Sequence, residues 1–197
     1  HAAVTRDLDR VIGRSAPLVT SMNRYQLMPS DIIDLTALRA RDPREPPSDP
    51  ELKARISEIC SGDRDDPVTC QRTVVPEAHA LAAFEESQVV QRLSALRSML
   101  AGLAVNPRRK TVVLLSTGIL ATDRPGGRPD LEDLGVVIGQ DAARANATIY
   151  TLHVDRRQDT MSASSPRRPR PYDNASRDAA ILARPLDQIA GASVARC

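Results

Sequence analysis

Residues 111–117, TVVLLST, are β-branched residues and leucines apart from Ser116, and they follow the basic triplet 108–110. A continuous apolar run of this length is typical of a strand buried on both faces of a parallel sheet. Residues 147–155, ATIYTLHVD, predict a second strand. Between the two, apolar residues at helical spacing predict a helix: Leu131, Leu134, Val137, Ile138, Ala142 and Ala145. A strand, helix, strand unit of this kind places its two strands parallel in one sheet.

Helices are predicted for most of the remaining chain. The longest covers residues 76–104, about 40 Å of helix, because apolar residues recur there every three or four positions: Val89, Leu93, Leu96, Leu100 and Leu103. Shorter helices are predicted over residues 3–23 with a break at Pro17, over 30–40, over 52–60, and over 186–191 with Pro185 at the first helical position.

Two segments lack any helical or strand pattern. Residues 42–50, DPREPPSDP, carry four prolines among charged residues, so they predict a connector. Residues 156–176 are rich in Arg, Pro and Ser and predict a flexible loop. Helix is therefore expected to exceed strand in an α/β fold.

Composition limits the classes of protein that the chain can belong to. Its 197 residues, 41% of them hydrophobic, suffice for one domain covering 1–197. The net charge of +2 gives no electrostatic reason to expect a nucleic acid or an anionic membrane as partner. Aromatic residues make up only 2% of the chain. The chain therefore lacks the aromatic side chains on which proteins that bind single-stranded nucleic acids stack the bases. No apolar run approaches the roughly 20 residues of a membrane-spanning helix.

The cysteines leave two states open. Cys60 and Cys70 are close in sequence and could form a disulfide in an oxidising compartment, which would leave Cys197 over. Reduced, buried thiols are equally compatible with this spacing. The ten-residue separation of the pair lacks the two-residue spacing of zinc knuckles, so no zinc site is predicted.

Three segments together resemble a known family. In chain order there are the long helix, the strand segment 108–118 (RRKTVVLLSTG), a second helix, the strand segment 145–155 (ANATIYTLHVD) and the segment 186–193 (LDQIAGAS). This order resembles the second half of a von Willebrand factor A domain. More narrowly, they resemble the VWFA-related domain of secreted, acidobacterial-type bacterial proteins. The resemblance implies a Rossmann-like parallel sheet flanked by helices, with residues 27–75 as a helical insertion. It also implies that the family's first strand is missing from this chain, which leaves one side of the strand at 111–117 unpaired.

The resemblance further implies a metal-ion-dependent adhesion site that has degenerated. In the family, an Asp-x-Ser-x-Ser motif, a Thr and an Asp hold Mg²⁺ through oxygen ligands, and the open position takes an acidic group of a partner. This chain has no Asp-x-Ser-x-Ser motif, and Thr117 takes the place of a family Asp. We therefore expect no cofactor, and Mg²⁺ only if residues upstream of this sequence supply that motif.

The carboxyl ends of parallel strands meet at one edge, where ligands of open α/β sheets bind. The expected binding edge consists of Ser116, Thr117, Gly118, Asp123, His153 and Asp155. With the resemblance, this edge predicts a non-enzymatic protein-interaction or adhesion-type module of an exported bacterial protein, secreted or periplasmic. Its partner is expected to be a protein, and its oligomeric state is not predicted.

Two other functions compete with this prediction. Ser116 and His153, with Asp155, are the residue types of a serine hydrolase, although LLSTG lacks the Gly-x-Ser-x-Gly elbow of such enzymes. On the simpler interpretation, Ser116 is a loop hydroxyl and His153 a structural strand residue. A third possibility is a scaffold whose binding site has decayed.

Overall fold

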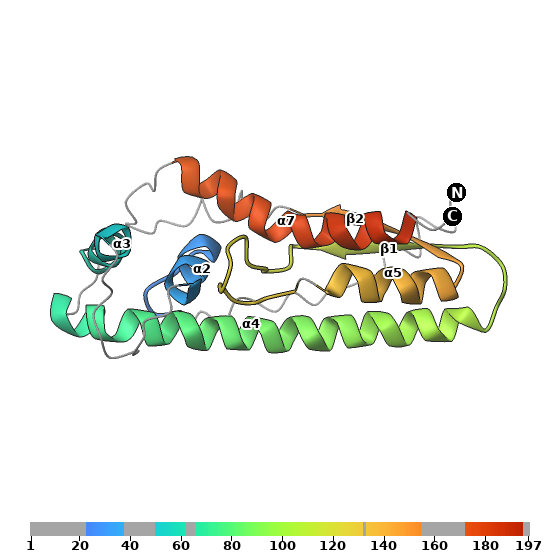
Figure 1. The fold of residues 1–197 in the computed structure, drawn as a ribbon, viewed down its shortest axis with the longest axis horizontal. Helices are drawn as coiled ribbons and strands as arrows, with labels where there is room; N and C mark the ends of the chain where they lie inside the picture. The colour runs from blue at the N-terminus through green and yellow to red at the C-terminus, as the bar shows by residue number, and fades with distance from the viewer. Residues whose placement is uncertain (1–22, 38–49, 62–65, 132, 155–171, 195–197) are drawn as a thin grey trace, which may run out of the picture.

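Five helices and two strands make up the described part of the chain. The computed structural model describes residues 23–37, 50–61, 66–131, 133–154 and 172–194. In order, the elements are α2 (Pro29–Ala37), α3 (Pro50–Cys60), α4 (Pro67–Ala104), β1 (Lys110–Ser116), α5 (Leu134–Arg144), β2 (Ala147–His153) and α7 (Tyr172–Val194) (Figure 1). The predicted mixed α/β class is confirmed.

The two strands pair in parallel, as predicted. The register joins Lys110 to Ala147 at one end and Ser116 to His153 at the other. The backbone pairing continues past the strand end, where Val154 N donates to Ser116 O at 2.8 Å. On the outer edge of β2, the hydroxyl of Ser193 in α7 accepts a hydrogen bond from Ile149 N at 3.0 Å. The helix therefore closes that edge of β2, while β1 has no second strand beside it within the described ranges.

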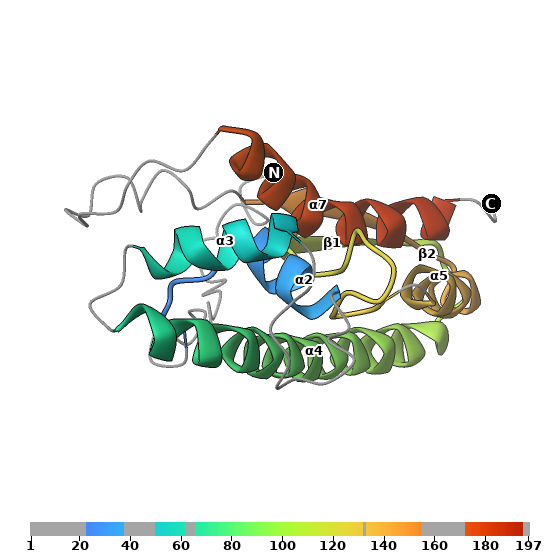
Figure 2. The same cartoon turned by 60° about the vertical axis from the view of Figure 1, so that its left-hand side comes forward.

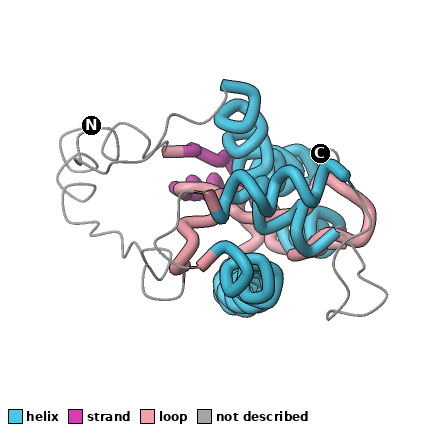
Figure 3. The backbone as a smooth tube through the Cα atoms, turned by 90° about the vertical axis from the view of Figure 1, so that its left-hand side faces the viewer, coloured by secondary structure: helices cyan, strands magenta, loops and turns pink. Residues whose placement is uncertain are grey.

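The prediction that residues 111–117 are buried on both faces is wrong for the described structure. Side chains along β1 alternate between partly buried and exposed, starting with Lys110. Val112 and Leu114 pack against the helical core, whereas Val113 and Leu115 on the other face are more than half exposed. The physical reason is that the described helices all lie on one side of the two strands (Figure 3).

Two clusters of buried side chains form the core, and α4 runs past both of them (Figures 1 and 2). The first cluster joins α2, α3 and the beginning of α4 to Leu120 and Ile181. The second joins the latter half of α4 to α5, β2 and the end of α7. The predicted apolar stripe of the long helix is confirmed. Leu103 is partly buried, and the other four members are buried: Val89, Leu93, Leu96 and Leu100.

The structure corrects two helix starts that were predicted at prolines. α4 begins at Pro67, nine residues before the predicted start, and runs through Pro76. Its start is capped by the Asp66 carboxylate, which accepts a hydrogen bond from Thr69 N at 3.2 Å. α7 likewise runs through Pro185. In α7, burial on both sides of the proline stabilises one continuous helix, since Ile181 lies in the first core cluster and Leu186 in the second.

The remaining predicted segments either differ from the observed elements only at their ends or lie outside the described residues. α2, α3, α5 and β2 agree with their predicted positions within a few residues. The segment predicted as a loop over 156–176 is helical from Tyr172 onward. Residues 1–22 and 155–171, which include most of the predicted 3–23 helix and Asp155, lie outside the description, as does the connector 42–50 except for Pro50.

Of the two cysteine states, the structure contains the disulfide. Cys60 at the end of α3 and Cys70 in α4 are bonded, with their Cα atoms 5.7 Å apart. Both are buried in the first core cluster. The bond therefore fixes the end of α3 against the beginning of α4.

A close helix crossing leads to a prediction for stability. A Cβ placed on Gly139 in α5 would lie 2.7 Å from the Ala192 carbonyl oxygen of α7. Because this obstacle is backbone, Gly139→Ala should lower the free energy of unfolding by about 2 kcal/mol, as in other overpacked cores. Gly102→Ala in α4 is the matched control, since its Cβ would meet nothing within 4 Å. It should instead stabilise the protein by roughly 0.5–1 kcal/mol. Urea unfolding followed by circular dichroism measures both, and a Gly139→Ala variant as stable as the wild type would contradict the close approach.

Candidate functional site at the carboxyl edge of the strands

Ser116 and His153 end the two strands as register partners, so the structure brings them to one edge. The Ser116 hydroxyl accepts a hydrogen bond from Gly118 N at 3.1 Å and lies 3.3 Å from Gly118 O. The serine is therefore engaged with the backbone of its own turn. This is the arrangement of a loop hydroxyl that stabilises a turn.

The His153 side chain is exposed, and its Nε2 lies 3.2 Å from the carbonyl oxygen of Thr117. In the tautomer with a proton on Nε2, the ring donates a hydrogen bond to that oxygen. The hydroxyl of Ser116 and the ring of His153 thus each have a backbone partner. No hydrogen bond joins these two side chains to each other. Thr117, at the position of the family Asp, is also exposed.

Gly118 ties this edge to the last helix. Its φ of +117° lies outside the region that residues with a Cβ normally adopt, so the turn after β1 depends on glycine. The next residue, Ile119, donates its N–H to the Leu182 carbonyl oxygen of α7 at 3.0 Å. The edge of the sheet is consequently held in place by α7.

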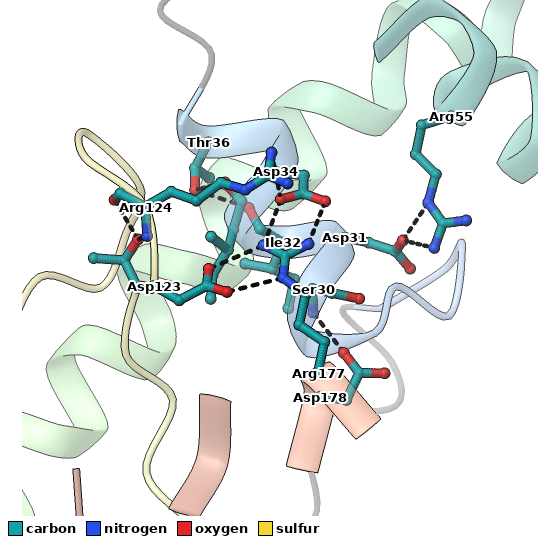
Figure 4. Close-up of polar contacts among 12 residues, drawn as sticks. Ser30, Asp31, Ile32, Asp34, Thr36, Arg55, Asp123, Arg124, Arg177 and Asp178 are labelled. Atoms are coloured by element: carbon teal, nitrogen blue, oxygen red, sulfur yellow. Dashed lines mark hydrogen bonds and ion pairs between the residues drawn. The ribbon is translucent and has the colours of Figure 1, made fainter. Parts of the chain in front are cut away.

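Asp123 takes part in a cluster that sequence reasoning missed (Figure 4). Arg177 of α7 donates to both oxygens of Asp34 in α2 at 2.8 and 2.7 Å, and to both oxygens of Asp123 at 2.9 Å. All three side chains are about a quarter exposed. We call these three residues the Arg177 cluster. One guanidinium therefore bridges two carboxylates from α2 and from the loop after β1.

The charges in the Arg177 cluster stabilise one another. Hydrogen bonds from Arg177 hold the pKa of the Asp123 carboxyl below its ordinary value, against the opposing effect of burial. The bonds to Asp123 and Asp34 in turn raise the pKa of the Arg177 guanidinium. Arg124 adds a second positive charge 3.2 Å from Asp34. The Asp123 carboxylate is therefore kept ionised, and the Arg177 guanidinium lies between two carboxylates of opposite charge.

The lowered pKa of Asp123 predicts a pH dependence of stability. A carboxyl whose pKa is lower in the folded than in the unfolded state stabilises the fold above its unfolded pKa, about 3.9. That stabilisation is lost as the pH falls below about 4 and the carboxyl becomes protonated. Asp123→Asn should therefore be less stable than the wild type at pH 7 and lose less stability between about pH 4 and pH 2. Urea midpoints across this range test the prediction.

The control for this pH series is Asp187→Asn, because Asp187 is exposed on α7 and has no ion pair with a described residue. It should keep the acid profile of the wild type. Equal acid profiles for Asp123→Asn and the wild type would contradict the role of the Arg177 cluster.

A second polar group fixes the other side of α2 (Figure 4). Ser30 N donates to the carboxylate of Asp178 at 2.8 Å, and both residues are buried. Arg55 of α3 donates to Asp31 at 2.8 Å through Nε. Sequence reasoning missed Arg55 and Asp178 because their partners lie far away along the chain. Arg55 carries a local signal, since it is a charged residue beside the apolar positions of the helix predicted over 52–60, whereas Asp178 lies outside every predicted helix.

The residues at this edge do not fit Mg²⁺. The oxygens of Asp123 already accept hydrogen bonds from Arg177, and Thr117 is a neutral residue. No group of three or more His, Cys, Asp or Glu side chains suited to a metal ion occurs within the described ranges. Asp155, the remaining member of the expected binding edge, lies outside them.

No helix among the described elements has the length and apolar character needed to cross a membrane. Comparison of the chain with protein-family models, with curated proteins and with solved structures gave no match. The site therefore has to be interpreted from its own geometry.

Proposed function

We propose that this chain is a non-enzymatic protein-interaction module of an exported bacterial protein, built as a VWFA-related domain with a degenerate metal site. Its binding edge in the described structure consists of Ser116, Thr117, Gly118, Asp123 and His153. The parallel strand, helix, strand unit supports the proposal, because ligands of such sheets bind at the carboxyl ends of the strands.

One observation carries the proposal. The polar groups of the edge have internal partners: Ser116 bonds to Gly118, His153 lies against the Thr117 carbonyl oxygen, and Asp123 pairs with Arg177. The positions of these groups are thereby fixed before any partner arrives, which lowers the entropic cost of binding. The exposed Thr117 and His153 side chains remain available for contact.

The geometry favours binding over hydrolysis. A serine hydrolase needs the nucleophile hydrogen-bonded to its general base, and that base oriented by a third group. Here the Ser116 hydroxyl bonds to Gly118 and the His153 ring to Thr117. If the chain cleaves an ester probe at all, Ser116→Ala should leave that rate unchanged.

A binding experiment tests the function. The immobilised full chain is exposed to exported proteins of its own organism, and any retained protein is identified and its affinity measured. Thr117→Arg and His153→Glu should weaken binding at least about tenfold, the loss of roughly 1.4 kcal/mol expected at a contact centre. Val90→Arg is the matched control, because Val90 is 59% exposed on α4 and is not a member of the binding edge.

The expected retention is the same in Mg²⁺ and in chelator, since the edge does not depend on a metal ion. Equal retention by Thr117→Arg, His153→Glu, Val90→Arg and the wild type would overturn the proposed edge. Loss of ester cleavage in Ser116→Ala would support the hydrolase instead.

A further inference from the structure

One face of the β1–β2 sheet exposes a continuous group of large apolar side chains. We call this group the open sheet face. Its members are each about half exposed: Val113 53%, Leu115 56%, Tyr150 56%, Leu152 52% and Val154 48%. The register places Val113 beside Tyr150 and Leu115 beside Leu152, so the side chains form one patch.

This patch is unusual for the surface of a parallel sheet. Parallel strands are normally covered on both faces, and the composition of β1 fits that rule. The described helices cover only the opposite face (Figure 3). Apolar patches of this kind in soluble proteins mark a place where another segment or molecule binds.

We infer that residues 1–22 of the same chain cover the open sheet face. Arg and Asp residues in this segment alternate with apolar residues that recur every three or four positions. The apolar residues are Val4, Leu8, Val11, Ile12, and then Leu18, Val19 and Met22. An apolar stripe of this kind needs a surface on which to be buried. The open sheet face is the matching surface within the described part of the molecule.

The point where the described chain begins supports this assignment. Tyr25 and Leu27 belong to the same core cluster as Leu120, four residues beyond the end of β1. Tyr25 is bonded to Glu77 and Thr73 near the beginning of α4, so residues 1–22 join the molecule at the end toward which the carboxyl ends of the strands point (Figure 1). A helix over residues 1–16, before the predicted break at Pro17, would span about 24 Å. A strand of seven residues is roughly 23 Å long, so the segment can follow the whole patch.

Covalent attachment favours this occupant over a separate molecule. A segment joined to the domain binds at the high effective concentration that its short connection sets. A second copy or a foreign chain would also lose its translational and rotational freedom on binding. The chain's own segment therefore covers the open sheet face at any protein concentration.

Reactivity of an introduced thiol tests the inference on the full chain. Val113→Cys is made in a Cys197→Ser background, and its reaction with a maleimide is compared with that of Val136→Cys. Val136 is the matched control, since it is 58% exposed on α5. Each rate is divided by that of the same variant unfolded in urea. Val113→Cys should react at least about tenfold more slowly, as expected for a site that opens only by local unfolding.

Changes in the segment itself make the test specific. Adding Val11→Asp and Ile12→Asp should raise the rate of Val113→Cys and leave Val136→Cys unchanged. Arg6→Asp with Arg10→Asp introduces as many carboxylates on the other side of the predicted helix and should leave both rates unchanged.

Two results would overturn the inference. If Val113→Cys reacts as fast as Val136→Cys, the open sheet face is available to another protein. If its protection disappears on dilution and sedimentation gives the mass of two chains, a second copy covers the face.

Discussion

Gly118→Ala should lower the free energy of unfolding by about 4 kcal/mol, the sum of a backbone and a packing effect. The φ of +117° at this position is strained for any residue with a Cβ. In addition, the new Cβ would lie 2.6 Å from the Cβ of Leu182 in α7. That atom is attached directly to the helix backbone, so a change of rotamer cannot relieve the clash. The turn after β1 or α7 itself has to move.

Gly126→Ala separates the two effects. Gly126 also has a positive φ, +78°, but the nearest atom to its added Cβ is a carbonyl oxygen 3.7 Å away. This variant should therefore lose only the backbone contribution, roughly 1–2 kcal/mol. Urea unfolding of both variants gives the comparison. Equal losses would show that contact with α7 does not hold the binding edge.

Removing the disulfide should have the second largest effect. Cys60→Ala with Cys70→Ala should lower the free energy of unfolding by about 3 kcal/mol, because the bond restricts the unfolded chain across a short loop. Both cysteines are also packed in the first core cluster, so their replacement leaves small voids. The measurement is urea unfolding of the oxidised wild type and the double variant.

A reductant supplies the internal control for the disulfide. It should destabilise the wild type and leave the double alanine variant unchanged. Alkylation followed by mass measurement should label Cys197 alone before reduction. Labelling of all three cysteines without reductant would contradict the bond, and with it one argument for an oxidising, extracytoplasmic compartment.

The sequence alone determined the local elements around residues 111–155. β1, α5 and β2 could be predicted because each has a hydrophobic period that depends on nearby residues. Their parallel pairing followed from the connecting helix, and the buried stripe of α4 from its three-and-four spacing. The meeting of Ser116 and His153 at one edge followed from the same unit.

Only the tertiary structure decided the course of α7 through Pro185, the packing of all described helices on one side of the strands, and the Arg177 cluster. Helix breaking by proline and burial of apolar strands are local tendencies, and contacts between distant segments override or complete them. Arg177 and Asp34 are 143 residues apart in sequence. Patterns of neighbouring residues cannot predict a contact over such a separation. Their pairing depends on the packing of α2 against α7, which joins charges that the sequence shows only as separate residues.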